Sequence, residues 1–160
     1  MRSESQHLAW DLFEEAYRAQ MSGELDRAVE LYKDSLDIHP TAEAHTYLGW
    51  TYHDLGKAED AIAECKRAIA IDPDFGNPYN DIGAYLIALG RYDEAIPWLE
   101  HAVAAPRYTP RHYPHFNLGR AYFAKSMLAR ARECFQKALE IEPDYALARQ
   151  AVDSLRRMVN

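Results

Sequence analysis

Apolar residues recur along most of this chain at the spacing i, i+3, i+4 and i+7, which places them on one face of an α-helix. A small residue, Gly or Ala, falls within the stripes and allows two helices to approach closely. Gly23, Gly56 and Gly90 lie between consecutive helical stretches, where a glycine ends one helix and turns the chain into the next. Ser126 holds the corresponding position further along. The pattern therefore predicts a series of helical hairpins.

The hairpins repeat at a nearly constant interval. Gly49, Gly83 and Gly119 are separated by 34 and 36 residues. Two further sets follow the same interval with small slips, the alanines Ala28, Ala61, Ala95 and Ala131 and the prolines Pro40, Pro73, Pro106 and Pro143. Recurrence at this period predicts four structural units in register.

The repeated residues resemble the motif of the tetratricopeptide-repeat family, which is a large residue followed by Leu-Gly, Tyr, Ala, an aromatic and a terminal Pro. The matches in the second unit are His45, Leu48, Gly49, Tyr52, Ala61, Cys65 and Pro73, and those in the fourth are His115, Leu118, Gly119, Tyr122, Ala131, Phe135 and Pro143. The third unit keeps most of the motif, with Pro106 one place early. In the first unit Glu15 replaces an apolar residue, as expected of a terminal capping unit.

The resemblance implies an all-α fold, in which four helix hairpins form a right-handed superhelical solenoid and a single domain over residues 1–160. The expected repeats are 9–41, 42–75, 76–111 and 112–145. Residues 146–160 are predicted to form a solitary amphipathic helix that caps the last repeat, because an uncapped solenoid end exposes apolar surface. The residues expected to make its contacts are Ala146, Leu147, Val152, Leu155 and Met158.

The composition suits a domain with a core, since 48% of the 160 residues are hydrophobic. There is no run of eighteen apolar residues and no apolar stretch of signal-peptide length at the N-terminus, so we expect a cytoplasmic protein without membrane insertion. Cys65 and Cys134 are too few for a disulfide framework and lie in no metal-binding spacing, which agrees with a reducing compartment.

The first helix of each unit carries a second stripe, which in the resembled family faces the concave side and binds partners. Its members are aromatic, amide and basic side chains, and the candidate peptide-binding residues are Tyr47, Trp50, Asn77, Asn80, Tyr113, Phe116, Asn117 and Arg120. Aromatic rings supply contact area, and amides bond to the donors and acceptors of a peptide backbone. The alternative for any single aromatic is simple packing between adjacent helices.

A clamp for a carboxyl-terminal peptide, which some tetratricopeptide proteins build from Lys or Arg and Asn on three successive helices, is incomplete here. Asn117 and Arg120 have suitable chemistry, but Phe13 and Tyr17, or Thr46 and Trp50, occupy the leading positions. We therefore do not expect recognition of a chaperone tail.

Charge is unevenly distributed along the chain. Residues 1–100 hold 8 Lys and Arg against 20 Asp and Glu, a net charge of −12, whereas residues 101–160 hold 10 against 5, a net charge of +5. The basic residues Arg107, Arg111, Arg120 and Lys125 are candidates to attract an acidic partner segment, the alternative being a solvated face. A pI near 5.5 argues against nucleic acid as the partner.

The sequence gives little support for a catalytic site or a metal-binding site. His112 and His115 lie one helical turn apart, but His115 occupies the large position of the motif and no third ligand is evident, so packing is the favoured role. No phosphate loop, nucleophile-base pair or paired acid motif occurs in the sequence. We expect a non-enzymatic protein without a cofactor.

The sequence therefore predicts a scaffold or adaptor that binds a peptide or partner segment in its concave groove. A second interpretation comes from the junction of units three and four, AAPRYTPRHYPHFNLG at residues 104–119, whose Pro-rich insertion resembles that of pilotin-like proteins that assist type IV pilus assembly. A third is a self-assembling scaffold, in which opposite charges of the two ends favour homo-oligomers.

Overall fold

The computed structural model describes residues 1–159, and every regular element in this part of the chain is an α-helix. The nine helices within these residues are α1 (Glu4–Met21), α2 (Leu25–Ile38), α3 (Ala42–Asp54), α4 (Ala58–Ile71), α5 (Asn77–Ala88), α6 (Tyr92–Ala104), α7 (His112–Ala124), α8 (Leu128–Ile141) and α9 (Ala146–Val159). The predicted all-α architecture is confirmed.

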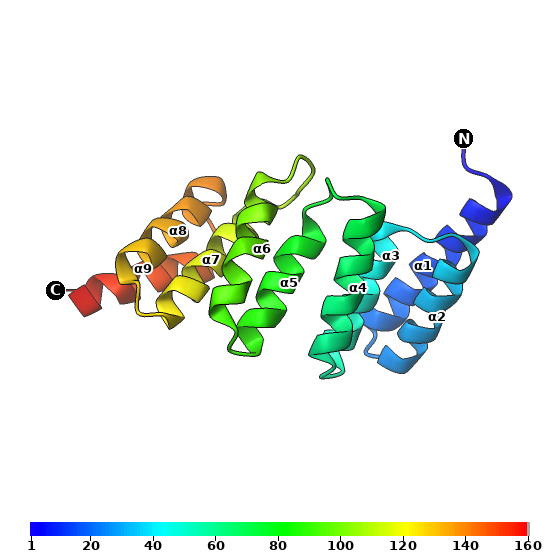
Figure 1. Ribbon diagram of the computed structural model, residues 1–160, viewed down its shortest axis with the longest axis horizontal. Coiled ribbons are helices and arrows are strands. Elements are labelled where there is room, and N and C mark those ends of the chain that lie inside the picture. The colour runs from blue at the N-terminus through cyan, green and yellow to red at the C-terminus, as the bar shows by residue number, and fades with distance from the viewer. Residues whose placement is uncertain (160) are drawn as a thin grey trace.

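The helices form an elongated row of hairpins that runs from the N-terminus to the C-terminus (Figure 1). Each odd-numbered helix from α1 to α7 packs most extensively against the helix that follows it, and neighbouring hairpins then pack on one another. The last helix, α9, packs on α8. Each unit thus buries its apolar face mainly against its immediate neighbours, which is the arrangement of a solenoid.

The turns inside the hairpins fall at the four positions that the sequence predicts. Gly23, Gly56 and Gly90 have φ angles of 80°, 79° and 76°, a left-handed conformation that glycine adopts without a Cβ clash. Ser126 takes the same conformation with φ 61°. In the first turn the backbone N–H of Glu24 bonds to the Ala19 carbonyl at 2.9 Å, which satisfies a carbonyl at the end of α1.

The small residues within the apolar stripes bring the paired helices into close contact. A Cβ added to Gly83 would lie 2.3 Å from Leu99 Cδ2, and one added to Gly119 would lie 2.5 Å from Phe135 Cε1. Leu99 and Phe135 are themselves almost fully buried. These glycines are therefore required by close approach within α5–α6 and α7–α8, as the motif suggests.

The first helix begins at Glu4, before the position 9 at which the first repeat is expected. Its start is fixed by a capping box in which Ser3 Oγ accepts a bond from the Gln6 backbone N–H, while the Gln6 side chain accepts one from the Ser3 backbone N–H. The expected repeat boundaries remain a prediction. No described helix combines the length and apolarity that crossing a membrane requires.

The C-terminal helix buries a narrower stripe than the sequence predicts. Val152 and Leu155 join the main core, and Ala148 is also buried. Leu147 and Met158, in contrast, are 52% and 61% exposed, and Ala146 is exposed. The predicted apolar face is therefore buried only in part, because α9 packs mainly on α8 and this contact covers a narrow stripe. Residue 160 of the predicted capping segment lies outside the described residues.

Candidate functional site

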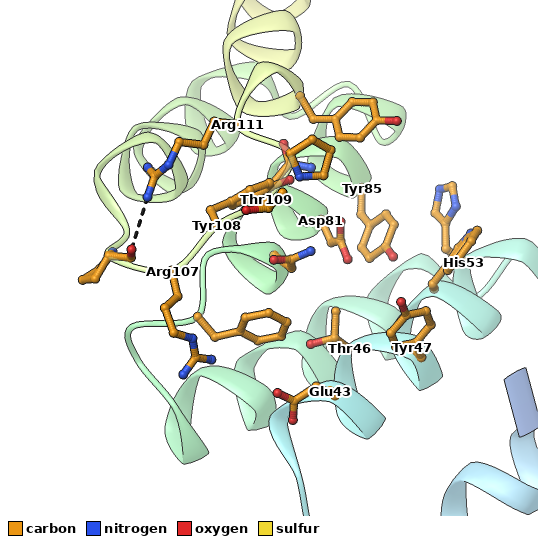
Figure 2. Close-up of a pocket in the computed structure, with 17 residues that line it drawn as sticks. Glu43, Thr46, Tyr47, His53, Asp81, Tyr85, Arg107, Tyr108, Thr109 and Arg111 are labelled. Carbon is orange, nitrogen blue, oxygen red and sulfur yellow. Dashed lines mark hydrogen bonds between the residues drawn. The ribbon is translucent and has the colours of Figure 1, made fainter. Parts of the chain in front are cut away.

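A pocket of about 970 Å³ opens between α3, α5 and the loop that joins α6 to α7 (Figure 2). We call it the α3–α5 pocket. Five of the candidate residues from the sequence line it: Tyr47, Trp50, Asn77, Asn80 and Tyr113. Phe116, Asn117 and Arg120 lie outside it, although they belong to the adjacent helix α7.

Aromatic rings form the wall on the side of α3. Tyr47 and Trp50 are one helical turn apart, with ring centroids 5.9 Å from each other, and Trp50 remains 40% exposed. His53 follows on the same face and stacks on Tyr85 of α5 at 4.5 Å. The i, i+3 spacing on α3 therefore turns three rings toward one opening.

The opposite wall is the α6–α7 loop, whose position depends on pairing with the α4–α5 loop. The Arg107 backbone N–H donates to the Asp74 carbonyl at 3.1 Å, and the Gly76 N–H donates to the Arg107 carbonyl at 2.7 Å. The Arg107 guanidinium also pairs with Asp72, at 2.6 Å between Nη2 and Oδ2. The Pro-rich insertion is thus folded onto the preceding loop and held there.

Two side chains complete this loop wall. Tyr108 is 6% exposed and packs over Gly76, where a Cβ would lie 2.4 Å from the Tyr108 ring. Arg111 donates from Nη2 to the carbonyls of Ala105 and Pro106 at 3.0 and 3.2 Å, which satisfies carbonyl groups just beyond the end of α6 (Figure 2). The sequence singled out Arg107 and Arg111 of this loop as basic candidates and showed the insertion that carries them, whereas the role of Tyr108 was not predicted.

Asp81 is the carboxyl group at the centre of the pocket. Figure 2 shows it beside Tyr85, between the loop and α3. Burial raises the pKa of Asp81 to about 7, and the Asn80 amide acts in the opposite direction. Burial also raises the pKa of Tyr47, with smaller contributions that include the charges of Asp81 and Glu43. The sequence places Asp81 in the same second stripe as Asn77 and Asn80, but Asp81 is not among the candidate peptide-binding residues; its burial in the pocket depends also on Tyr47 of α3 and Tyr108 of the loop.

A chain of side-chain hydrogen bonds joins α5 to α7. Asn117 Nδ2 donates to Asn80 Oδ1 at 2.9 Å, and Arg120 Nη1 donates to Asn117 Oδ1 at 3.0 Å. Asn80 and Asn117 are each 7% exposed. Asn117 is therefore engaged in holding the helices together, whereas Asn80 also faces the pocket. The role of these residues in ligand binding remains a prediction.

Phe116 lies in a second aromatic group at the α7 end of the molecule. Its ring is 5.4 Å from Phe135 and 5.2 Å from Tyr145, and Tyr113 is 5.8 Å from Tyr145. These contacts agree with the alternative that Phe116 packs between adjacent helices and does not bind a partner. Tyr113 differs, since it is 41% exposed and borders the pocket.

The aromatic surface continues from the pocket onto α1. Phe13 and Tyr17 contact Tyr47 at 5.3 and 5.7 Å between ring centroids, and Trp10 stacks on Phe13 at 5.1 Å. Trp10 and Tyr17 are 39% and 41% exposed. The α3 wall is therefore one end of a longer aromatic stripe that reaches the first unit.

The two histidines that suggested a metal pair have aromatic and polar surroundings instead. His112 is buried against the rings of Tyr113 and Tyr145, at 4.2 and 4.7 Å. Burial, with Lys137 nearby, lowers the pKa of His115. Throughout the described chain, no group of three or more His, Cys, Asp or Glu side chains is placed to hold a metal ion.

Two family models for tetratricopeptide repeats match the chain, one over residues 13–74 and the other over residues 74–144. Among curated proteins, the type IV pilus assembly protein PilF of Pseudomonas aeruginosa is 29% identical over 129 residues, which are 78% of this chain and 51% of that protein. The chain spans 16% to 51% of the length of the first curated relatives it matches.

Solved structures agree with the family matches. The structure of P. aeruginosa PilF has a TM-score of 0.90 at 23% identity, over 96% of this chain and 69% of that one. The first repeat domain of Spaghetti (RPAP3), bound to the HSP90 peptide SRMEEVD, has a TM-score of 0.68 at 22% identity, over 74% of this chain and 92% of that one. At these identities the two structures show a common fold. The repeated motif, the stacked hairpins and the family models together show that this chain belongs to the tetratricopeptide-repeat family.

Proposed function

We propose that this protein is an interaction module, without catalytic activity of its own, that binds a segment of a partner protein in the α3–α5 pocket. The observation that carries the proposal is the pocket itself, about 970 Å³ in volume and lined by aromatic, amide and charged side chains from three helices and a fixed loop. A cavity of this size with a few convergent polar groups is the usual form of a binding site.

The chemistry of the walls suits an extended peptide. Tyr47 and Trp50 offer broad apolar faces at low conformational cost, and Asn77 and Asn80 offer amide groups for a peptide backbone. The repeat domain of RPAP3, which shares this fold, was solved with a bound peptide. This supports a peptide or protein segment as the class of ligand.

An acidic part of the partner segment would meet Arg120, at the α7 end of the groove. Arg120 is exposed and bonds to Asn117, so its guanidinium retains donors for a carboxylate. The other basic candidates have partners inside the protein: Arg107 pairs with Asp72, Arg111 with backbone carbonyls and Lys125 with Asp93. Among the described residues Arg120 bonds to a neutral side chain, so its positive charge is not matched by a carboxylate.

We place this adaptor in the cytoplasm. The thiols of Cys65 and Cys134 are both free, as is usual in a reducing compartment. Burial raises the pKa of both thiols, so they are better suited to packing than to redox chemistry.

The second candidate function is a pilotin-like assembly factor for a cell-surface apparatus. It is favoured by the match to the pilus assembly protein PilF over 78% of this chain and by the Pro-rich loop at residues 105–111. In this alternative the partner would be a component of such an apparatus. A homo-oligomeric scaffold is the remaining alternative.

The proposal is tested by affinity capture of partners with the full chain, followed by binding measurements on two variants. Trp50→Ala should weaken a captured partner more than tenfold, because Trp50 presents a large ring to the pocket. Ile141→Ala, on α8, is the matched control, since Ile141 is 44% exposed and lies outside the pocket.

Three results would redirect the proposal. A partner that is unaffected by Trp50→Ala but lost in Ile141→Ala would place binding on the second helices. Capture of a component of a pilus apparatus would favour the assembly factor. Light scattering that shows a salt-sensitive oligomer, with no other protein captured, would favour self-assembly.

A further inference from the structure

Asp81 has no counter-ion in the part of the chain that the structure describes. The ion pairs found there join other residues, and Asp81 takes part in none of them. Its carboxyl lies on α5 and faces the pocket. A partly buried carboxylate without a partner is costly, because burial removes water without supplying an opposite charge.

The walls around Asp81 are aromatic. Tyr47 lies on the α3 side, Tyr85 lies one turn along α5, and Tyr108 lies on the loop side (Figure 2). Trp50 of α3 also lines the pocket. The face of an aromatic ring carries partial negative charge and attracts a cation within about 6 Å of its centre. A cation in this pocket would therefore be favoured by the rings and by the carboxylate together.

The basic side chains that line the pocket already bind partners within the protein. Arg107 pairs with Asp72 at 2.6 Å, and Arg111 donates to backbone carbonyls at 3.0 and 3.2 Å. Glu43, in contrast, adds a second carboxylate at the mouth of the pocket and joins no ion pair in the described chain. When Asp81 and Glu43 are both ionised, these two unpaired negative charges outweigh the one lining cation without a carboxylate partner in the described chain, Arg111.

We infer that the α3–α5 pocket receives a Lys or Arg side chain of the partner segment, with Asp81 as its counter-ion and the rings of Tyr47 and Trp50 along its stem. The inference rests on the proposed function and deepens it, since it names the chemistry that the pocket selects. It differs from the carboxylate recognition expected at Arg120, which lies outside the pocket.

The titration of Asp81 agrees with this geometry. Burial raises its pKa to about 7, so the empty pocket holds a carboxyl that is ionised only in part at neutral pH. A bound cation favours the ionised form and releases the proton. The other titratable or charged groups at the pocket are Glu43, Tyr47 and His53 on α3, Tyr85 on α5, Tyr113 on α7, and Arg107, Tyr108 and Arg111 on the loop.

The inference is tested by nuclear magnetic resonance titration of the full chain with three small probes, the Nα-acetyl N-methylamides of arginine, norleucine and glutamate. The Trp50 indole N–H and the Asn80 side-chain amide report occupation of the pocket. The arginine probe should bind at least tenfold more tightly than either other probe. Asp81→Asn, which keeps the shape of the side chain, should remove this preference, as expected for loss of a charge-assisted contact.

Two controls separate the pocket from general electrostatics. Asp153→Asn removes an exposed carboxyl on α9 and should leave the arginine affinity unchanged. Affinity for the arginine probe should fall about tenfold from pH 8 to pH 6, as the ionised fraction of a group with pKa about 7 falls. Asp81→Asn should flatten this profile, and His53→Gln should keep most of it.

The inference is overturned if the glutamate or norleucine probe binds as tightly as arginine, if Asp81→Asn retains the preference, or if no probe shifts the Trp50 and Asn80 signals. The captured partner distinguishes this failure from failure of the proposed function. If the partner no longer binds Trp50→Ala but still binds Asp81→Asn, the pocket remains the binding site and the inference of a bound Lys or Arg side chain is refuted. If the partner still binds both variants, the proposal that the pocket is the binding site is refuted as well.

Discussion

Gly76→Ala should displace the α6–α7 loop and thereby alter the pocket. Gly76 precedes α5 with φ −78° and ψ −24°, so the backbone itself accepts alanine. The space around Gly76 does not accept a methyl group, because the new Cβ would lie 2.4 and 2.8 Å from Tyr108 atoms and 2.9 Å from Ala105 Cβ. Tyr108 is buried and cannot give way without moving the loop.

The expected cost follows from three contributions. Overpacking of a filled site costs about 1–3 kcal/mol, and loss of the 2.7 Å bond from Gly76 N–H to the Arg107 carbonyl adds about 1 kcal/mol. Removing a glycine from the unfolded chain returns about 0.4–1 kcal/mol. The net loss is about 1–3 kcal/mol, which lowers the melting temperature by about 2–12 °C in a domain of this size.

Thermal and denaturant unfolding measure this loss, and a double-mutant cycle identifies its cause. Tyr108→Ala should cost less in the Gly76→Ala background than in the wild type, with a coupling above about 0.5 kcal/mol. Gly56→Ala is the matched control: its φ is 79° and no atom lies within 4 Å of the added Cβ, so it is strained without a clash. Wild-type stability of Gly76→Ala, or no coupling to Tyr108, would refute the packing argument.

Three further predictions concern other parts of the molecule. Deleting residues 146–160 should lower the denaturant midpoint and cost about 3–6 kcal/mol, because Val152 and Leu155 each bury a large apolar side chain; an unchanged midpoint would make α9 peripheral. Arg120→Ala should weaken a groove-bound partner more than about tenfold in a direct binding assay, and equal affinity would exclude the residue from the site. Asp81→Asn should stabilise the fold at pH 8 and have little effect at pH 4, as measured by urea unfolding. The pKa of Asp81 is raised to about 7 when folded, so stability falls as pH rises toward 7; about 1.4 kcal/mol per pKa unit sets an upper limit near 4 kcal/mol.

The repeated local pattern of the sequence determined the fold to a large extent. Helical periodicity, the recurring Gly and Ala and the positions Gly23, Gly56, Gly90 and Ser126 predicted the hairpins and their turns, and the structure has them there. These features are readable because each depends on residues near in sequence or on a repeated neighbour. A solenoid has mainly such contacts, so its architecture follows from one unit and its repetition.

The pocket was determined by contacts between units, which no single repeat encodes. The second stripe indicated Tyr47, Trp50, Asn77, Asn80 and Tyr113, but the sequence could not separate them from Asn117, which bonds to Asn80 across 37 positions. Only the tertiary structure brought the loop around Tyr108 onto Gly76 and left Asp81 among aromatic rings, with no counter-ion in residues 1–159. The same limit applies to α9, where the number of neighbouring helices, and not the apolar pattern, decided that Leu147 and Met158 stay in solvent.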